Sequence, residues 1–232
     1  AVLEAGQGPP VVLLHGQGGW SGMWLPVIAD LVNTHRVVAP DLPGLGASEV
    51  PDGLPDAERV LAWLDALVQR TCPDPPALVG ASLGASIAAR FAIAYPERVS
   101  RLVLISAGSL ARFRPAPGVM LALIRFIARP NERTQEGFMR QVAVDPARVR
   151  ALMGDRGAAS QAYSLDRART PSVRAANRFM LRELGTKTIL PQDLARIAVP
   201  TALIWGRHDR VMRLRIAEQA STRYGWPLHV IE

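Results

Sequence analysis

The sequence of 232 residues predicts an α/β protein with a doubly wound, mostly parallel sheet and a helical segment inserted between two of its strands. Short apolar runs of strand length alternate along the chain with longer stretches whose apolar residues recur at helical spacing. Between residues 108 and 191 this alternation stops and only helical patterns remain. We therefore expect a core made of residues 1–107 and 192–232, and a helical lid, here called the lid segment, made of residues 108–191.

The first part of the chain predicts three units of strand and helix. Residues 1–10 indicate the end of a strand followed by a Gly/Pro turn. Residues 11–14 form a continuous apolar run, typical of a strand buried on both faces of a parallel sheet. The predicted strands of this part are residues 11–14, 36–39 and 77–79, and the predicted helices are residues 23–31, 56–69 and 83–95.

The second part of the chain adds three strands and the lid segment. Three helix starts are predicted inside the lid segment, at Pro117, Asp145 and Ser172, and two of these helices cover residues 119–128 and 173–184. Outside the lid segment, the predicted strands are residues 99–106, 201–205 and 227–231, with a helix over residues 213–224.

Composition and charge narrow the class of protein. Apolar residues make up 49% of the chain, no apolar run reaches the roughly 18 residues of a membrane span, and the single cysteine, Cys72, provides no disulfide framework. We therefore expect a cytoplasmic protein with no membrane partner. The net charge of +7 comes from basic residues of segment 109–190, which lie along helices without interleaved aromatic residues. This pattern indicates a solvated helix face or an acidic substrate or partner, and we expect no nucleic-acid partner.

One short stretch carries chemistry in its spacing, Gly80-x-Ser82-x-Gly84. It lies between a predicted strand and a predicted helix, where a strained turn can lift a serine hydroxyl above the edge of a sheet. Small residues are needed there because neighbouring backbone passes close to the turn. The alternative interpretation is an ordinary turn with a capping serine. A serine nucleophile also needs a histidine base and a carboxylate that orients it, so the rest of the chain decides between the two.

Three further motifs each follow a predicted strand: His15-Gly16, then Asp41-x-x-Gly44-x-Gly46-x-Ser48, and finally Trp205-Gly206-Arg207-His208-Asp209. Together with the Ser82 motif they stand in the order and spacing of the α/β-hydrolase fold family. Outside the lid segment, nearly the whole chain resembles that family. The resemblance implies acyl-type hydrolysis through a serine nucleophile.

The resemblance also assigns roles to residues. It implies that Ser82 is the nucleophile and Asp209 the carboxylate that orients the base. It places the oxyanion hole at the backbone N–H groups of Gln17 and Leu83. His15 is interpreted as a structural histidine that holds its loop. No metal and no cofactor are implied, and the expected partner is a small-molecule substrate.

The sequence departs from the family pattern at the catalytic histidine, which would act as the base. Chain order predicts a histidine after Asp209, in a loop just past the last strand. His229 lies inside that strand, and His208 adjoins Asp209, so that both side chains are poorly placed to face one serine. We therefore expect a fragment trimmed at both ends whose catalytic histidine lies just beyond Glu232. The alternative is a real loss of the base, which leaves a noncatalytic binding protein with a hydrolase body.

The nucleophile and the lid segment indicate a substrate class. Within the family, Ser82 is consistent with carboxylesterases and with the carbon–carbon hydrolases of aromatic ring-cleavage products. The latter usually have Asn before the serine, where this chain has Ala81, whereas the basic lid segment keeps them open as an alternative. We predict hydrolysis of a small, largely apolar carboxylic ester through an acyl-enzyme. The residues predicted to line its pocket are Trp20, Phe138, Phe179 and Arg178.

A hypothesis of another class rests on Gly16-x-Gly18 and Asp41. These residues follow successive strands, as the residues of a dinucleotide-binding fingerprint do. The third glycine of that fingerprint would fall at Ser21. The segment is therefore better explained as an oxyanion loop than as a nucleotide site.

Overall fold

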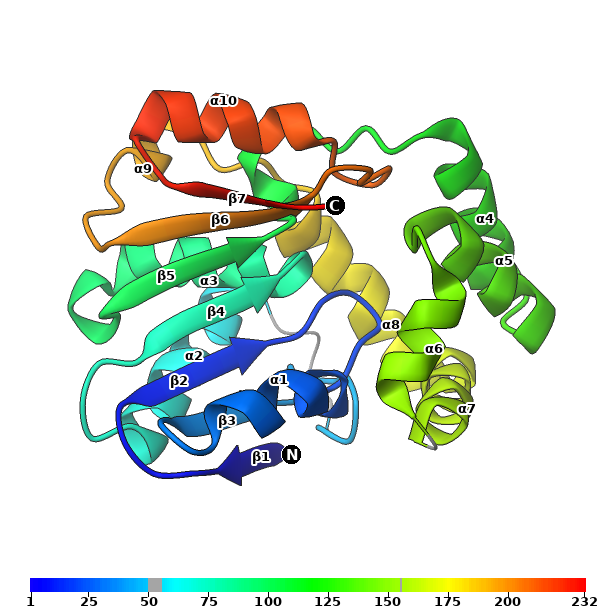
Figure 1. Ribbon diagram of the computed structural model, residues 1–232, viewed down its shortest axis with the longest axis horizontal. Coiled ribbons are helices and arrows are strands. Elements are labelled where there is room, and N and C mark those ends of the chain that lie inside the picture. The colour runs from blue at the N-terminus through cyan, green and yellow to red at the C-terminus, as the bar shows by residue number, and fades with distance from the viewer. Residues whose placement is uncertain (50–55, 155) are drawn as a thin grey trace.

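A computed structural model describes residues 1–49, 56–154 and 156–232 and shows a seven-stranded sheet with helices on both faces (Figure 1). The strand order is β1-β3-β2-β4-β5-β6-β7. Strands β2 to β7 pair in parallel, whereas β1 pairs antiparallel with β3 at one edge. The predicted doubly wound, mostly parallel sheet is confirmed. The strands are β1 (Val2–Ala5), β2 (Pro10–Leu14), β3 (Arg36–Pro40), β4 (Ala77–Ala81), β5 (Arg101–Ile105), β6 (Thr201–Gly206) and β7 (Leu228–Ile231).

The helices outside the lid segment connect these strands and cover the sheet. They are the 3-10 helix η1 (Ser21–Trp24), α1 (Leu25–Leu31), α2 (Ala57–Thr71), α3 (Leu83–Ala94), the 3-10 helix η2 (Pro96–Arg98) and α10 (Leu214–Tyr224). Helix α2 begins where Asp56 accepts a hydrogen bond from the Arg59 N–H at 2.8 Å, an N-cap that satisfies one of the free donors of its first turn.

Alternate side chains of the strands form two apolar cores, one on each face of the sheet. On one face, Val11, Leu13 and Val37 pack with Trp24 and Ile28 near α1. The other face carries the larger core, to which α2, α3 and α10 contribute. Every residue of β2 is buried, as the apolar run of residues 11–14 predicted. Because parallel strands end at the same edge, the loops after β2, β3, β4 and β6 meet there.

The N-terminal segment differs from its prediction. Residues 1–10 indicated only the end of a strand, yet Val2–Ala5 forms a complete strand paired with β3. Its side chains are mostly exposed, since it is an edge strand. A four-residue strand of this kind gives no apolar periodicity, because its stability comes from backbone pairing with Val37–Pro40.

Most of the lid segment lies beyond the carboxyl ends of the parallel strands, with α4 to α7 standing apart from the sheet in Figure 1. Its elements are η3 (Gly108–Leu110), α4 (Pro117–Ala128), α5 (Glu132–Val142), α6 (Pro146–Met153), α7 (Arg156–Arg169), α8 (Pro171–Met180) and the π-helical turn η4 (Leu181–Gly185). The short helix α9 (Pro191–Leu194) begins at the last residue of the lid segment and lies near the start of β6. None of the helices within the described ranges is long and apolar enough to cross a membrane.

Helix α8 ends earlier than predicted. A single helix over residues 173–184 was expected, but the regular helix stops at Met180 and a π-helical turn follows. The Thr186 N–H closes this turn by donating to the Leu181 carbonyl at 2.8 Å. Gly185 lies on the side of this turn that faces the residue after Ser82, since a Cβ at Gly185 would lie 3.5 Å from Leu83 Cδ1. The lid segment thus meets the body directly beside the residue that follows Ser82.

Candidate active site

The backbone of Ser82 forms a sharp turn between β4 and α3. Strand β4 ends at Ala81 and α3 begins at Leu83, so Ser82 alone makes the connection. Its φ of 51° and ψ of −107° lie where residues with a side chain are rarely found. The Ser82 N–H donates to the Ile105 carbonyl of β5 at 2.8 Å, which holds the turn against the sheet. This is the strained strand-to-helix turn that the motif predicts.

Two glycines allow this turn to close. A Cβ at Gly84 would lie 2.2 Å from the Leu14 carbonyl oxygen, and a Cβ at Gly80 would lie 2.4 Å from the Gly84 carbonyl carbon. Both contacts involve backbone atoms, which cannot rotate away as a side chain can. The spacing Gly80-x-Ser82-x-Gly84 is therefore required by close backbone packing at both ends of the turn.

The loop after β2 passes directly beside the turn at Ser82. A Cβ at Gly16 would lie 3.4 Å from Ser82 Cβ and 3.3 Å from the Ala81 carbonyl oxygen. The Gly19 N–H donates to the Gly16 carbonyl at 3.1 Å and closes a tight turn, whose hydrogen bond does not use the N–H of Gln17. Leu83 is the first residue of α3, so its N–H has no acceptor within the helix. Among the described residues, both assigned oxyanion donors are thus backbone N–H groups without a hydrogen-bond acceptor.

His15 is fixed by hydrogen bonds at both ring nitrogens. Its Nδ1 lies 2.9 Å from the Gly16 carbonyl oxygen, and its Nε2 accepts from the Leu42 N–H at 3.0 Å. These partners select the neutral ring with the proton on Nδ1. Burial lowers the pKa of His15, although the hydrogen bond to Gly16 and the charge of Asp41 act in the opposite direction. With both nitrogens in use, His15 joins the loops after β2 and β3 and has no nitrogen left to act as a base.

Asp41 closes the loop after β3. Its buried carboxylate accepts from the N–H groups of Ser21 at 2.6 Å and Ala47 at 2.7 Å. Gly46 is required at its position, because φ is +55° and a Cβ would lie 2.3 Å from the Asp41 carboxyl carbon. A carboxylate used in this way is not available to a ribose, so the geometry gives no support to the dinucleotide hypothesis.

Asp209 lies in the loop after β6 and lines the same pocket as Ser82. Its Oδ1 accepts from the N–H groups of Val211 and Met212, both at 2.8 Å. Within the described part of the chain, Oδ2 carries no hydrogen bond. The first oxygen therefore fixes the carboxylate in its loop, and the second is free to accept from another group.

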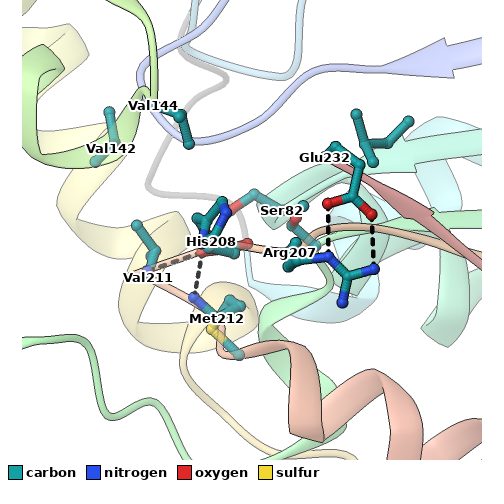
Figure 2. A pocket seen from close by; sticks show the side chains of 12 residues that line it. Ser82, Val142, Val144, Arg207, His208, Val211, Met212 and Glu232 are labelled. Carbon is teal, nitrogen blue, oxygen red and sulfur yellow. Dashed lines mark hydrogen bonds and ion pairs between the residues drawn. The ribbon is translucent and has the colours of Figure 1, made fainter.

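The pocket above Ser82 has a volume of about 370 Å³ and lies between the body and the lid segment (Figure 2). Val142 and Val144 border it from the lid segment. From the body come Ser82 itself, Ser106 and the loop after β6. Its apolar lining residues are Val142, Val144, Val211, Met212 and Ile231.

Arg207 and Glu232 form an ion pair at the rim of this pocket. Arg207 Nε and Nη2 donate to the two carboxylate oxygens of Glu232, each at 2.6 Å. Figure 2 shows this bidentate pair across the pocket from Val142 and Val144. The hydrogen bond with Arg207 lowers the pKa of Glu232. The pair neutralises these two charges, and the Asp209 carboxylate is a further charged group that lines the pocket.

The two histidines that follow β6 in the chain differ in where they lie. His229 lies inside β7, opposite Ile204 of β6, with an exposed side chain. His208 lines the pocket and is exposed. Among the described residues, no histidine ring forms a hydrogen bond with Ser82 or Asp209. The histidine base expected after Glu232 stays a prediction.

Of the predicted pocket residues, Trp20 lies in the body and Arg178 in the lid segment. The ring of Trp20 packs against Tyr163 of α7, with 4.7 Å between the ring centroids. Arg178 is exposed on α8. Neither belongs to the described lining of the pocket at Ser82. Their role as pocket residues stays a prediction.

The other two predicted pocket residues lie within the lid segment. Phe138 of α5 stacks on Phe126 of α4, with 6.1 Å between parallel rings. Phe179 of α8 lies beside the guanidinium of Arg182, which is 6.0 Å from its ring centroid. These two are also absent from the described lining at Ser82, and their role stays a prediction.

Ser106 was not singled out from the sequence. It follows β5, lines the pocket, and is the one other described non-glycine residue with a positive φ, at 47°. Its N–H donates to the Ile204 carbonyl at 3.1 Å. A lone serine after a strand carries no motif, so only the backbone geometry distinguishes it.

Comparison with known proteins agrees with this geometry. The family described as alpha/beta hydrolase fold matches residues 9–227. The chain is 32% identical over 229 residues to the 2-hydroxy-6-oxo-6-phenylhexa-2,4-dienoate hydrolase of Burkholderia cepacia, covering 91% of this chain and 75% of that protein. It is 32% identical over 144 residues to the pimeloyl-(acyl-carrier protein) methyl ester esterase of Aeromonas hydrophila, covering 60% of this chain and 56% of that protein.

A solved structure shows the same architecture. The 2-hydroxy-6-oxo-6-phenylhexa-2,4-dienoate hydrolase of a Rhodococcus species superposes with a TM-score of 0.85 at 24% identity, covering 99% of this chain and 85% of that chain. Its likeness concerns the fold, whereas the family match spans the loops that carry the Ser82, His15 and Asp41 motifs. From the strained turn at Ser82 and from this match, we conclude that the chain belongs to the α/β-hydrolase fold family.

Proposed function

We propose that this chain forms the body of a serine hydrolase that cleaves a small, largely apolar carboxylic ester through an acyl-enzyme. Ser82 Oγ attacks the carbonyl carbon while a histidine base takes its proton, and Asp209 orients that histidine. The N–H groups of Gln17 and Leu83 stabilise the oxyanion. The alcohol leaves with the proton from the base, and water then attacks the acyl group on Ser82 to release the acid. The base is the histidine predicted after Glu232.

The backbone of Ser82 is the observation that carries this proposal. A serine at φ 51° and ψ −107° is strained, and strained backbone is retained where the surrounding structure enforces it. Here Gly80, Gly84 and the Ile105 carbonyl enforce it together. The same turn brings the hydroxyl to the pocket that Asp209 also lines.

The chemistry of the pocket favours an uncharged substrate. Its five apolar lining side chains suit an alkyl or aryl group, and burial of such a group is favourable by about 25 cal/mol per Å². The guanidinium of Arg207 is already occupied by Glu232, which leaves it poorly suited to bind a substrate carboxylate. An ester without charge fits these features better than a carboxylate-bearing substrate.

A second candidate is carbon–carbon bond hydrolysis of an aromatic ring-cleavage product. The relative of Burkholderia cepacia, which bears the name of such a hydrolase, is 32% identical over 91% of this chain. Both reactions begin with a carbonyl carbon beside a serine, so the site at Ser82 serves either. We place the ester first because Ala81 offers no side-chain hydrogen-bond donor beside Ser82 and because Arg207 is paired.

A direct comparison of two substrates tests the proposal. A chain extended past Glu232 is assayed with 4-nitrophenyl butyrate and with 2-hydroxy-6-oxo-6-phenylhexa-2,4-dienoate. We expect a higher kcat/KM for the ester. Ser82→Ala should reduce ester hydrolysis at least about 10³-fold, whereas Ser100→Ala, at an exposed serine before β5, should leave it unchanged.

Two outcomes contradict the proposal in different ways. A higher kcat/KM for the dienoate would favour the second candidate. Hydrolysis of neither substrate by the extended chain would favour a noncatalytic binding protein with a hydrolase body.

A further inference from the structure

One residue of the lid segment joins α8 to the loop that carries Gln17. The side-chain nitrogen of Gln17, Nε2, donates to the backbone oxygen of Asn177 at 2.8 Å and to its Oδ1 at 2.6 Å. The Gly18 N–H donates to the same Oδ1 at 3.2 Å. All three hydrogen bonds run from two consecutive loop residues to a single residue of α8.

The partners of these bonds fix the orientation of both side-chain amides. The backbone oxygen of Asn177 can only accept, so Gln17 must present its NH₂ group there. The Gly18 N–H can only donate, so Asn177 must present its Oδ1. The arrangement is therefore self-consistent, with one oxygen of Asn177 accepting from both a side chain and the backbone of the loop.

Asn177 stands on a rigid support. Helix α8 buries Val173, Ala176 and Met180, and these residues belong to the main core that also contains Leu83. The loop on the other side contains three glycines, and Gly18 has a φ of +67°, a conformation in which other residues are strained. Asn177 thus ties this loop to a helix that is packed in the core.

We infer that Asn177 is a positioning residue for the oxyanion hole, holding Gln17 so that its backbone N–H faces the carbonyl group attacked by Ser82. This inference rests on the proposed function. Gln17 is fixed on one side by Gly16, which packs against Ser82, and on the other by Asn177. A donor stabilises an oxyanion only when it is already aligned, and a displacement of about 1 Å can cost about 10²-fold in rate.

Substitutions at position 177 separate positioning from general support. Asn177→Ala removes Oδ1 and with it two of the three hydrogen bonds, while alanine's helix propensity leaves α8 intact. Asn177→Asp keeps an oxygen acceptor for both donors. The control is Arg169→Ala, which removes a hydrogen bond to the Pro130 carbonyl inside the lid segment and leaves the loop untouched.

The expected results concern kcat and the Gly18 amide. In a chain extended past Glu232, Asn177→Ala should lower kcat for 4-nitrophenyl butyrate about tenfold and change KM less than about twofold, because the oxyanion exists only in the transition state. Exchange of the Gly18 amide hydrogen, measured by NMR, should become at least about threefold faster. Asn177→Asp should recover most of the kcat, and Arg169→Ala should change neither quantity.

Contrary results are distinguishable. An active wild-type chain whose Asn177→Ala variant keeps its kcat, or whose Gly18 amide exchanges at an unchanged rate, overturns the inference alone. An equal loss of kcat in Arg169→Ala also overturns it, since the lid segment would then act only as general support. A wild-type chain that hydrolyses no ester overturns the proposed function, and the inference fails with it.

Discussion

At the scale of single residues, the turn at Ser82 depends on what its neighbours lack. Gly80 and Gly84 have no side chain, and in each case the place of a Cβ is taken by backbone atoms at 2.2 to 2.7 Å. Such contacts differ from ordinary crowding in a core, because a carbonyl held in a sheet or helix has no alternative rotamer.

Gly84→Ala should therefore destabilise the protein strongly. The added methyl group would lie 2.2 Å from the Leu14 carbonyl oxygen and 2.7 Å from that of His15. We expect a loss of about 2 to 3 kcal/mol or more in the free energy of unfolding, measured by urea denaturation.

A matched substitution at Gly137 provides the control. Gly137 lies inside α5 with open space where a Cβ would stand. Gly137→Ala should stabilise the protein by about 0.5 to 1 kcal/mol, because alanine loses less backbone entropy in a helix. Similar effects of both substitutions would show that the close contacts at Gly84 do not matter.

His15 links stability to pH. Burial lowers its pKa in the folded chain below the value of about 6.5 found in unfolded chains. Below that pH the unfolded state binds more protons than the folded state, so stability falls as pH decreases. Its contribution is fully present above about pH 6.5 and is lost progressively as pH falls toward the folded pKa.

His15→Gln should make stability less dependent on acid. The glutamine oxygen can accept from the Leu42 N–H, as Nε2 does, but it does not titrate. We expect the slope of unfolding free energy against pH, between pH 6.5 and 5, to decrease by up to about 1.4 kcal/mol per pH unit. An identical slope in the variant would show that His15 is protonated equally in both states.

At the scale of residues, the sequence predicts those features of the site that depend on short motifs. The motif at Ser82 predicted the strained turn, and the glycines around it predicted close backbone contacts. Asn177 and Ser106 were not found, because their significance depends on contacts with residues far away in the sequence or on a backbone angle. Neither leaves a local pattern.

At the scale of elements, the lid segment is not uniform. Helix α8 buries three side chains in the main core, whereas α4 buries Val119 and α5 buries Gln135. Helices α4 and α5 pack mainly on each other, with Phe126 against Phe138, and α4 exposes Leu121, Ile124 and Ile127. If the lid segment opens over the pocket, moving α4 and α5 breaks fewer contacts with the core than moving α8.

Hydrogen exchange should reveal this division. We expect the backbone amides of α4 and α5 to exchange at least about tenfold faster than those of α8, measured by mass spectrometry on peptides from each helix. The extended helix patterns of residues 119–128 and 173–184 look alike in sequence, so only packing distinguishes them. Equal protection of all three helices would mean that the lid segment behaves as one rigid body.

The ends of elements and the edge strand were the parts of the fold least accessible from sequence. Strand periodicity predicted β2 to β7 within a few residues, since their apolar side chains face a core. Strand β1 depends on backbone pairing, and the π-helical turn after Met180 depends on packing against Leu83. The spacing of apolar residues predicts neither of these interactions.

At the scale of the whole molecule, the parallel sheet brings the loops of the candidate site together. Loops that are up to 195 residues apart, from His15 to Arg210, meet because β2, β3, β4 and β6 end at one edge. The parallel, doubly wound sheet was predictable from alternating strands and helices, and so was the edge at which the motifs meet, whereas the order of the strands came from the structure. Which lid side chains face the pocket was not, because helix orientation depends on contacts across the whole molecule.

Covalent labelling shows whether Ser82 is a nucleophile. A chain extended past Glu232 is treated with a fluorophosphonate, digested and analysed by mass spectrometry, with Ser82→Ala treated in parallel. We expect one adduct, on the peptide that contains Ser82, and none in the variant, because only a hydroxyl beside a base and an oxyanion hole reacts rapidly. An adduct on Ser106 instead, or no adduct on the extended chain, would contradict this expectation.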